Sequence, residues 1–251
     1  MLCLHGIEAH GLRYVGLASY LDGVGIVAPD LRGHGRSPRT GPFSLDQHVQ
    51  DLLPILSDLG PETTLLGHSY GGYIAWEVAR AAPDAIARLV LVDPAMELRW
   101  EFVQQYVEVA PTRFRWPDRE AAFRELSSKR QISAHWSVAL DVAVGLEETG
   151  RDGSLRVAIV DDAFAACWEQ VTRPIKESSW RGPTLLLEAG QENAEFVTPS
   201  ALASLRRQLG DRLSYAVVDL PHTIPADGPD VLAAHVRPFL SSRAPTQDAS
   251  P

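Results

Sequence analysis

The 251-residue chain has few residues of several types, and each shortage excludes a class of protein. Its two cysteines, Cys3 and Cys167, are too few for a disulfide framework and match no metal-ligand spacing. Only two of its 23 basic residues are lysines, and the scattered arginines form no patch for an anionic membrane. We therefore expect neither a disulfide scaffold nor a metal centre nor a membrane-surface protein.

Long apolar runs and net positive charge are also missing. No apolar stretch approaches the roughly 18 to 20 residues of a membrane span, and the N-terminus lacks the basic region and long apolar segment of a signal peptide. With 32 acidic against 23 basic residues, the net charge of −9 opposes binding to a phosphate backbone. We expect a cytoplasmic protein that handles a small neutral or amphipathic molecule and binds neither nucleic acid nor membrane.

The chain does have the apolar content and patterning of a globular α/β protein, with 45% hydrophobic and 22% charged residues. Short apolar runs alternate with helical patterns, which is typical of a mostly parallel sheet flanked by helices. The runs predict strands at residues 2–4, 25–28, 63–67, 88–92, 183–188 and 213–218. Helices are predicted at residues 12–21, 45–59, 72–82, from Thr198 onward, and at 229–240. Ser44 and Gly60 mark the two ends of the second of these helices.

Residues 95–182 differ from the rest, because they carry helical periodicity and almost no β-rich run. We predict that they form a helical cap inserted into one α/β core, which residues 1–94 and 183–240 build. Residues 241–251, rich in serine, proline and alanine, are expected to be a flexible tail.

Tryptophan is concentrated in this insertion, where five of the six in the chain fall within residues 97–181. Aromatic side chains can line an apolar pocket, and they can also pack cap helices against one another. We expect Trp100, Trp136 and Trp168 to face the cleft between cap and core, with His10 at its entrance. Such a cleft suits a mostly apolar substrate.

The pentapeptide GHSYG at residues 67–71 lies between an apolar strand and a helix, and it matches the pattern G-x-S-x-G. In this pattern the serine occupies a turn so tight that its backbone is strained and its hydroxyl is exposed above the sheet. Side chains at Gly67 or Gly71 would collide with their neighbours. The pattern predicts Ser69 as a nucleophile; the alternative is a glycine-rich turn without chemistry.

Two further segments accompany this turn, LCLHGI near the start and PDLRGHGRS at residues 29–37. Together with GHSYGG, in this order and at these intervals, they resemble the α/β-hydrolase fold superfamily over residues 2–94 and 183–240. The resemblance implies a helical cap after the strand that follows the nucleophile helix, and a reaction without cofactor or metal. It also implies that the backbone N–H groups of Ile7 and Tyr70 bind the oxyanion.

One part of the superfamily pattern has no counterpart here. Two antiparallel strands normally precede the segment that resembles LCLHG, and this sequence begins inside that segment. An exposed sheet edge is a site for oligomerisation or aggregation, so a homo-oligomer is one expectation.

His222 is the general base that we predict among the eight histidines. It stands in a loop after the strand at 213–218, and the segment LPHTIPADGPDVLAAHVRPFL resembles the histidine loop of the superfamily. His235 falls inside the final helix, whereas His5 and His68 adjoin the active-site turns and are expected to shape them.

The third member of the triad has three candidates. Many members of the superfamily carry the acid after the strand at 183–188, in a pattern like G-x-x-D, but Asn193 stands at that position here. A neutral amide cannot stabilise the imidazolium charge. Asp93, 24 residues beyond Ser69, ends the strand after the nucleophile helix, where certain lactonases and amidohydrolases of the superfamily carry their acid. We favour Asp93, with Glu192 and Glu195 as alternatives.

These residues predict a serine hydrolase that cleaves a carboxylic ester or lactone of a small, mostly apolar molecule through an acyl-enzyme. An amide or C–C bond hydrolase would use the same residues. The competing class is a hydrolase-like ligand-binding protein with little turnover, which Asn193 and the missing N-terminal strands support. A serine nucleophile argues against the dehalogenases and epoxide hydrolases of this fold, which use aspartate.

Overall fold

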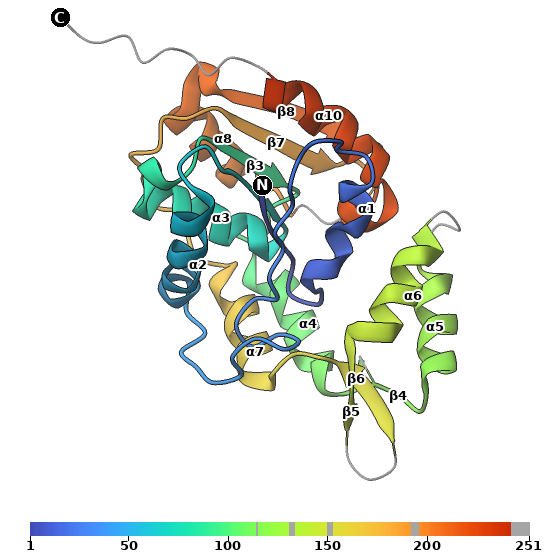
Figure 1. Ribbon diagram of the computed structural model, residues 1–251. Helices are drawn as coiled ribbons and strands as arrows, with labels where there is room; N and C mark the ends of the chain where they lie inside the picture. Colours follow the sequence, from blue (N-terminus) through green and yellow to red (C-terminus); the bar gives the residue numbers. More distant parts are fainter. Residues whose placement is uncertain (114, 131–133, 150–152, 192–195, 242–251) are drawn as a thin grey trace, which may run out of the picture.

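Five parallel strands form the central sheet of the computed structural model, which describes residues 1–113, 115–130, 134–149, 153–191 and 196–241 (Figure 1). In spatial order they are β1 (Leu2–Leu4), β2 (Thr64–His68), β3 (Arg88–Val92), β7 (Thr184–Ala189) and β8 (Leu213–Val218). Each neighbouring pair is parallel. The predicted α/β fold with a mostly parallel sheet is therefore confirmed.

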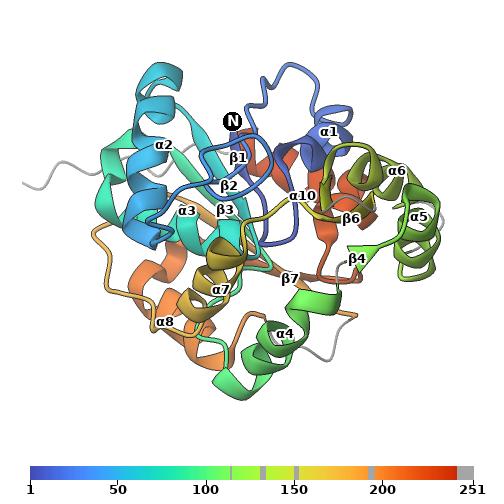
Figure 2. The same ribbon diagram turned by 90° about the horizontal axis from the view of Figure 1, so that it is seen from below.

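Helices cover both faces of this sheet (Figure 2). Alternate side chains of each strand point to opposite faces, so that Leu65 and Leu66 of β2 belong to two different apolar clusters. The first cluster also contains residues of α2 (Leu45–Leu59), α3 (Tyr70–Ala81) and α8 (Pro199–Leu209). The second contains residues of α1 (Val15–Ala18) and α10 (Pro229–Ser241). Burial on both faces explains why the strands read as nearly continuous apolar runs.

The ends of the long helices follow local signals in the sequence. The hydroxyl of Ser44 accepts a hydrogen bond from the Gln47 N–H at the start of α2, and Gly60 ends this helix with a φ of 85°. Thr198 accepts in the same way from the Ala201 N–H at the start of α8. These boundaries agree with the prediction.

Two predicted elements near the N-terminus are shorter than expected. Residues 25–28 run beside β1 but make a single parallel bridge, Leu2 to Val27, because Pro29 follows at once and has no N–H for a ladder. The predicted helix at 12–21 is a 3₁₀ turn, Gly11–Tyr14, followed by α1. The Ser19 hydroxyl donates to the Gly16 carbonyl at the end of α1, in competition with a further helical turn.

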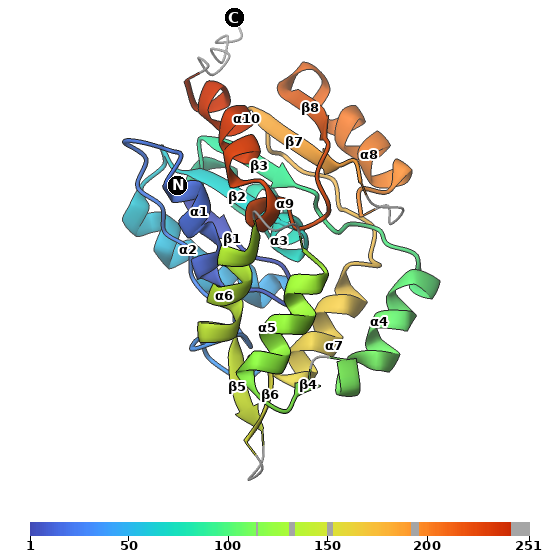
Figure 3. The same cartoon turned by 90° about the vertical axis from the view of Figure 1, so that its right-hand side faces the viewer.

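The segment between β3 and β7 contains helices, as predicted, and also three short strands that the helical periodicity did not indicate. It is built from α4 (Trp100–Arg113), β4 (Arg115–Trp116), α5 (Arg119–Ser128), α6 (His135–Val144), β5 (Leu146–Thr149), β6 (Ser154–Val157) and α7 (Asp161–Gln170). Figure 3 shows these helices together on one side of the central sheet.

The three strands of this segment form a small antiparallel sheet in the order β4-β6-β5. The sequence gives little sign of it, because the strands are two to four residues long and carry opposite charges in place of apolar runs. Glu147 of β5 lies opposite Arg156 of β6, with their side chains 2.8 Å apart. The limits of a separate cap at residues 95–182 stay a prediction.

No helix within the described ranges is long and apolar enough to cross a membrane. The predicted flexible tail lies outside the described residues from position 242 onward, and Ser241 is the last residue of α10.

The turn between β2 and α3 is packed too closely for side chains at its glycines. A Cβ atom on Gly67 would lie 2.1 Å from the carbonyl oxygen of Gly71, and one on Gly71 would lie 2.3 Å from that of Leu4. Both obstacles are backbone atoms, which cannot move aside as the end of a long side chain can. These contacts are the collisions that the G-x-S-x-G pattern predicts.

We expect Gly71→Ala to lower the free energy of unfolding by about 2 kcal/mol or more, because the added methyl group must push α3 away from β1. Gly25→Ala is the matched control, since a Cβ there meets nothing within 4 Å, and its effect should stay within about 0.5 kcal/mol. Urea denaturation followed by circular dichroism measures both. Equal stability of the two variants would contradict the packing argument.

Candidate active site

Ser69 lies on the turn between β2 and α3 with a strained backbone. Its φ of 54° and ψ of −122° are unusual for a residue with a side chain, and it is the N-cap of α3. The backbone is held on both sides, because the Ser69 N–H donates to the Val92 carbonyl and its carbonyl accepts from the Ala95 N–H. This geometry places the hydroxyl in a cavity at the carboxyl ends of the strands.

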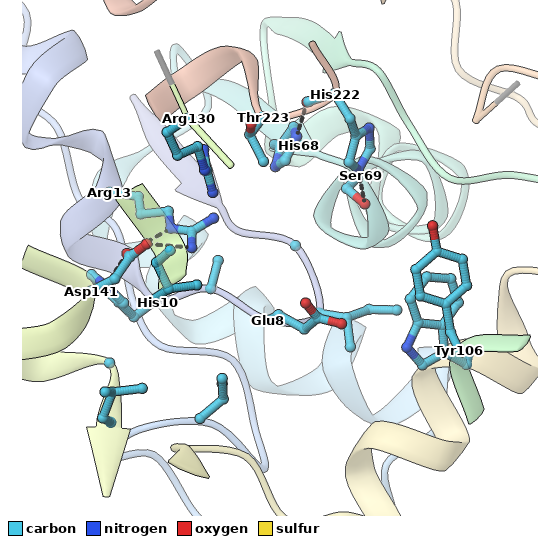
Figure 4. A pocket seen from close by; sticks show the side chains of 18 of the residues that line it. Glu8, His10, Arg13, His68, Ser69, Tyr106, Arg130, Asp141, His222 and Thr223 are labelled. Atoms are coloured by element: carbon cyan, nitrogen blue, oxygen red, sulfur yellow. Dashed lines mark hydrogen bonds and ion pairs between the residues drawn. The ribbon is translucent and has the colours of Figure 1, made fainter. Parts of the chain in front are cut away.

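A chain of hydrogen bonds links Ser69, His222 and Asp93, and Figure 4 shows the link between Ser69 and His222. The Ser69 Oγ atom lies 2.9 Å from Nε2 of His222, and Nδ1 of His222 lies 2.5 Å from Oδ2 of Asp93. With the proton on Nδ1, His222 donates to the carboxylate and accepts from the serine hydroxyl. Its Nε2 atom is then ready to remove the serine proton.

Asp93 is placed by the end of β3, which lies between β2 and β7 in the sheet. Its N–H donates to the Leu187 carbonyl, and its Oδ1 atom accepts from the Ala189 N–H at 3.0 Å. The residue is 2% exposed and has a φ of 42°, a second strained position beside Ser69. The carboxylate is thus held by the sheet itself.

His222 comes from the loop after β8, two strands away from β3, so this loop must return across the ends of β7 and β3. Two contacts hold it there. The ring of Phe196 stacks on the His222 ring, with centroids 3.6 Å apart and 14° between planes. The Nε2 atom of His68 donates to the His222 carbonyl at 2.7 Å. Burial, and then the nearby His222, lower the pKa of His68 well below 6.5, so His68 stays neutral.

The turn at Gly6 and Ile7 lies against the serine, since a Cβ on Gly6 would be 3.1 Å from the Cβ of Ser69. His34 donates from Nε2 to the Ile7 carbonyl at 2.6 Å, and His5 donates from Nδ1 to the Gly6 carbonyl at 2.7 Å. Within the described ranges, no protein acceptor takes the N–H of Ile7 or of Tyr70. Two free donors thus stand beside the serine.

The cavity around Ser69 has a volume of about 250 Å³ and two different ends (Figure 4). One end is aromatic, with Tyr106 stacked on Trp168 at 4.5 Å between centroids. The other end is charged and is lined by His10, Arg13, Arg130 and Asp141. The cavity can hold a small molecule that has an apolar part and a polar part.

The predicted pocket residues divide into two groups. His10 and Trp168 line the cavity. The predictions for Trp100 and Trp136 are wrong: neither lines it, because Trp100 is 50% exposed on α4 and the ring of Trp136 packs against Gly16 of α1. Trp116 lines the cavity instead, from β4.

Other lining residues were not predicted. Arg13, Arg130, Phe196 and Thr223 come from four separate segments, and no local motif marks them. The position of Thr223 directly after His222 was the one available signal. The alternative acids Glu192 and Glu195, and Asn193 between them, lie outside the described residues. Within the described ranges, no group of three or more His, Cys, Asp or Glu side chains could hold a metal ion.

Comparison with known proteins adds to this geometry. The family model of the alpha/beta hydrolase fold matches residues 1–229. The chain is 31% identical to lipase LipV of Mycobacterium tuberculosis, over 97% of this chain and 94% of that protein. It is 28% identical to the sn-1-specific diacylglycerol lipase ABHD11 of Mus musculus, over 95% of this chain and 80% of that protein. Among solved structures, E-2-(acetamidomethylene)succinate hydrolase superposes with a TM-score of 0.81 at 22% identity, covering 96% of this chain and 91% of that one.

Four buried histidines around the serine predict how stability depends on pH. Burial lowers the pKa of His5, His34, His48 and His68 below the ordinary value of 6.5, and that of His48 to about 4. In the unfolded chain these histidines bind protons near pH 6.5, whereas in the folded chain they do not. The free energy of unfolding should therefore fall as the pH drops from 7 to 5. Urea denaturation at several pH values measures this slope.

His48→Gln removes one of these protons and should reduce the loss of stability between pH 7 and 5 by roughly 1–2 kcal/mol. His235→Gln, at a partly exposed site on α10, is the control and should keep the slope of the unaltered protein. If stability depended on pH in His48→Gln as it does in the unaltered protein, burial of His48 would not be a cause of the loss of stability in acid.

Proposed function

The chain belongs to the alpha/beta hydrolase fold family, and from this premise we propose that it is a serine esterase with Ser69 as nucleophile, His222 as base and Asp93 as acid. The observation that carries the proposal is the continuous chain of hydrogen bonds from Ser69 through His222 to Asp93. Its relatives LipV and ABHD11 are named as lipases, which cleave carboxylic esters. The substrate is a small ester that reacts through an acyl-enzyme.

In the first half of the reaction, the Ser69 oxygen attacks the carbonyl carbon of the ester while Nε2 of His222 takes its proton. The buried Asp93 carboxylate stabilises the imidazolium that forms and keeps the ring in its orientation. The N–H groups of Ile7 and Tyr70 stabilise the negative oxygen of the tetrahedral intermediate. The alcohol then leaves with the proton from His222.

In the second half, a water molecule attacks the acyl-enzyme and gives its proton to His222. A second tetrahedral intermediate forms and collapses, the acid product leaves, and the proton returns to Ser69. His34 and His5 act indirectly, because they hold the peptide groups at Gly6 and Ile7 in place.

Whether the substrate is an open-chain ester or a lactone is a finer part of the proposal. A lactone is a cyclic ester and reacts by the same steps, whereas an amide nitrogen must take the proton from His222 before it can leave. A panel of short-chain esters, lactones, amides and ring-cleavage products, assayed with the unaltered protein and Ser69→Ala, separates these classes. A cap at residues 95–182, a cytoplasmic location and a homo-oligomer likewise stay proposals.

Ser69→Ala should abolish labelling by a fluorophosphonate probe, because the probe bonds covalently to an activated serine oxygen. Ser19→Ala removes an exposed hydroxyl at the end of α1 and should be labelled like the unaltered protein. Labelling is read by mass spectrometry of the intact protein. Equal labelling of Ser69→Ala would refute the nucleophile, and no labelling of any form would favour the ligand-binding alternative.

Asp93→Asn should lower kcat for a 4-nitrophenyl ester by about 10³-fold or more, since the amide cannot stabilise the imidazolium. Glu192→Gln removes the alternative acid and should change kcat by less than about threefold. Steady-state kinetics of both variants, with circular dichroism to check folding, tests the choice. A large loss only in Glu192→Gln would assign the acid to Glu192.

A further inference from the structure

Two arginines from distant parts of the chain meet at the charged end of the cavity. Arg13 comes from the 3₁₀ turn before α1, and Arg130 follows α5. Both line the cavity, and their side chains are 13% and 14% exposed. In Figure 4 the two guanidinium groups lie at the end of the cavity opposite to Tyr106.

Each arginine has an acidic partner, but neither uses all its donors. Arg13 donates from Nε and Nη2 to Asp141 at 2.9 and 2.8 Å, and Arg130 donates from Nη1 to Asp227 at 2.9 Å. A guanidinium group has five N–H donors. In the part of the chain that the structure describes, no acceptor takes the Nη1 of Arg13 or the Nε and Nη2 of Arg130.

The acidic partners are covered, while the arginines keep contact with the cavity. The side chain of Asp227 is fully buried and that of Asp141 is 9% exposed. Asp141 also accepts from His10 at 3.0 Å. Although burial opposes its ionisation, Arg13 and His10 lower the pKa of Asp141 to about 2. A molecule in the cavity therefore meets hydrogen-bond donors at this end.

The two guanidinium groups are also close enough to repel each other. Burial, and then the charge of Arg13, lower the pKa of Arg130. An anion that accepted hydrogen bonds from both side chains would relieve this repulsion and would use the free donors.

We propose that Arg13 and Arg130 bind a carboxylate group of the substrate, so that the ester hydrolysed at Ser69 also carries a free acid. This inference rests on the proposed esterase function and adds the class of its substrate. The planar fork of arginine matches a carboxylate, with two parallel hydrogen bonds to its oxygens. A monoanion suits the site better than a phosphate dianion, because Asp141 and Asp227 already offset the two positive charges.

The rest of the cavity sets the orientation of such a substrate. Glu8 lines the wall between the arginines and Tyr106 in Figure 4, and its carboxylate repels a second acid group in that region. The stacked rings of Tyr106 and Trp168 offer an apolar surface at the other end. The substrate therefore places its acid at the arginines and its apolar group at these rings, with the ester carbonyl at Ser69.

Pairs of esters that differ only in the acid group test this proposal. 4-Carboxyphenyl acetate and 4-methylphenyl acetate carry the difference on the alcohol side, and monophenyl glutarate and phenyl pentanoate carry it on the acyl side. In at least one pair, the kcat/KM of the acid should exceed that of its neutral partner by about tenfold or more. A neutral ester that is equal or faster in both pairs would overturn the proposal.

Arg130→Gln should lower the ratio of kcat/KM between acid and neutral ester by about tenfold or more in that pair. Arg207→Gln, which removes a 64% exposed arginine on α8, is the matched control and should leave the ratio unchanged within about twofold. An equal ratio in the two variants would overturn the role of Arg130. Even if Arg130→Gln does not fold, the preference of the unaltered protein for the acid over the neutral ester tests the substrate class.

Different results would reject the arginine site alone and the arginine site together with the esterase function. If Ser69 takes the fluorophosphonate label and the esters are hydrolysed without preference for the acid, only the arginine site is wrong. If Ser69 is not labelled and none of the four esters is hydrolysed, the esterase function and the arginine site are both wrong.

Discussion

The close approach of α3 to β2 at Gly67 and to β1 at Gly71 is the constraint on which the rest of the site depends. With backbone atoms about 2 Å from where a Cβ would be, only glycine allows the chain to leave β2 and enter α3 in so short a turn. The turn forces Ser69 into its strained conformation and exposes the hydroxyl at the end of the sheet. Parallel pairing with β3 then places Asp93 one strand away, at the same edge. Without that turn, neither Asp93 nor His222 would have a serine to act on.

Buried neutral histidines perform much of the positioning around this turn. His68 holds the loop that carries His222, while His5 and His34 hold the peptide groups at Gly6 and Ile7. Burial keeps them neutral, and each donates from one ring nitrogen to a carbonyl oxygen beside the site. We expect the same burial to lower stability in acid, because unfolding lets these rings take up protons. Orientation of the site and acid lability thus have one physical origin.

The cavity combines two surfaces that recognise different chemistry. Its aromatic end comes from α4 and α7, and its charged end comes from the turn before α1, the end of α5 and α6. The insertion between β3 and β7 thus supplies the aromatic end and half of the charged end, while the core supplies Ser69, Asp93 and His222. A core of this kind can keep one reaction and change its substrate when the insertion changes.

The sequence by itself determined the strand order along the chain, the long helices and the turn at Ser69, because strands, caps and glycine turns depend on neighbours within a few residues. It also narrowed the acid to three residues. Only the tertiary structure decided that Asp93 contacts His222, that Trp116 and not Trp136 lines the cavity, and that Arg13 meets Arg130. These contacts join residues more than 100 positions apart, and their partners are set by the order of strands in the sheet and by the packing of the insertion on it. The short strands β4, β5 and β6 escaped prediction for the same reason, since each is stabilised by its neighbours in the sheet and hardly at all by its own pattern.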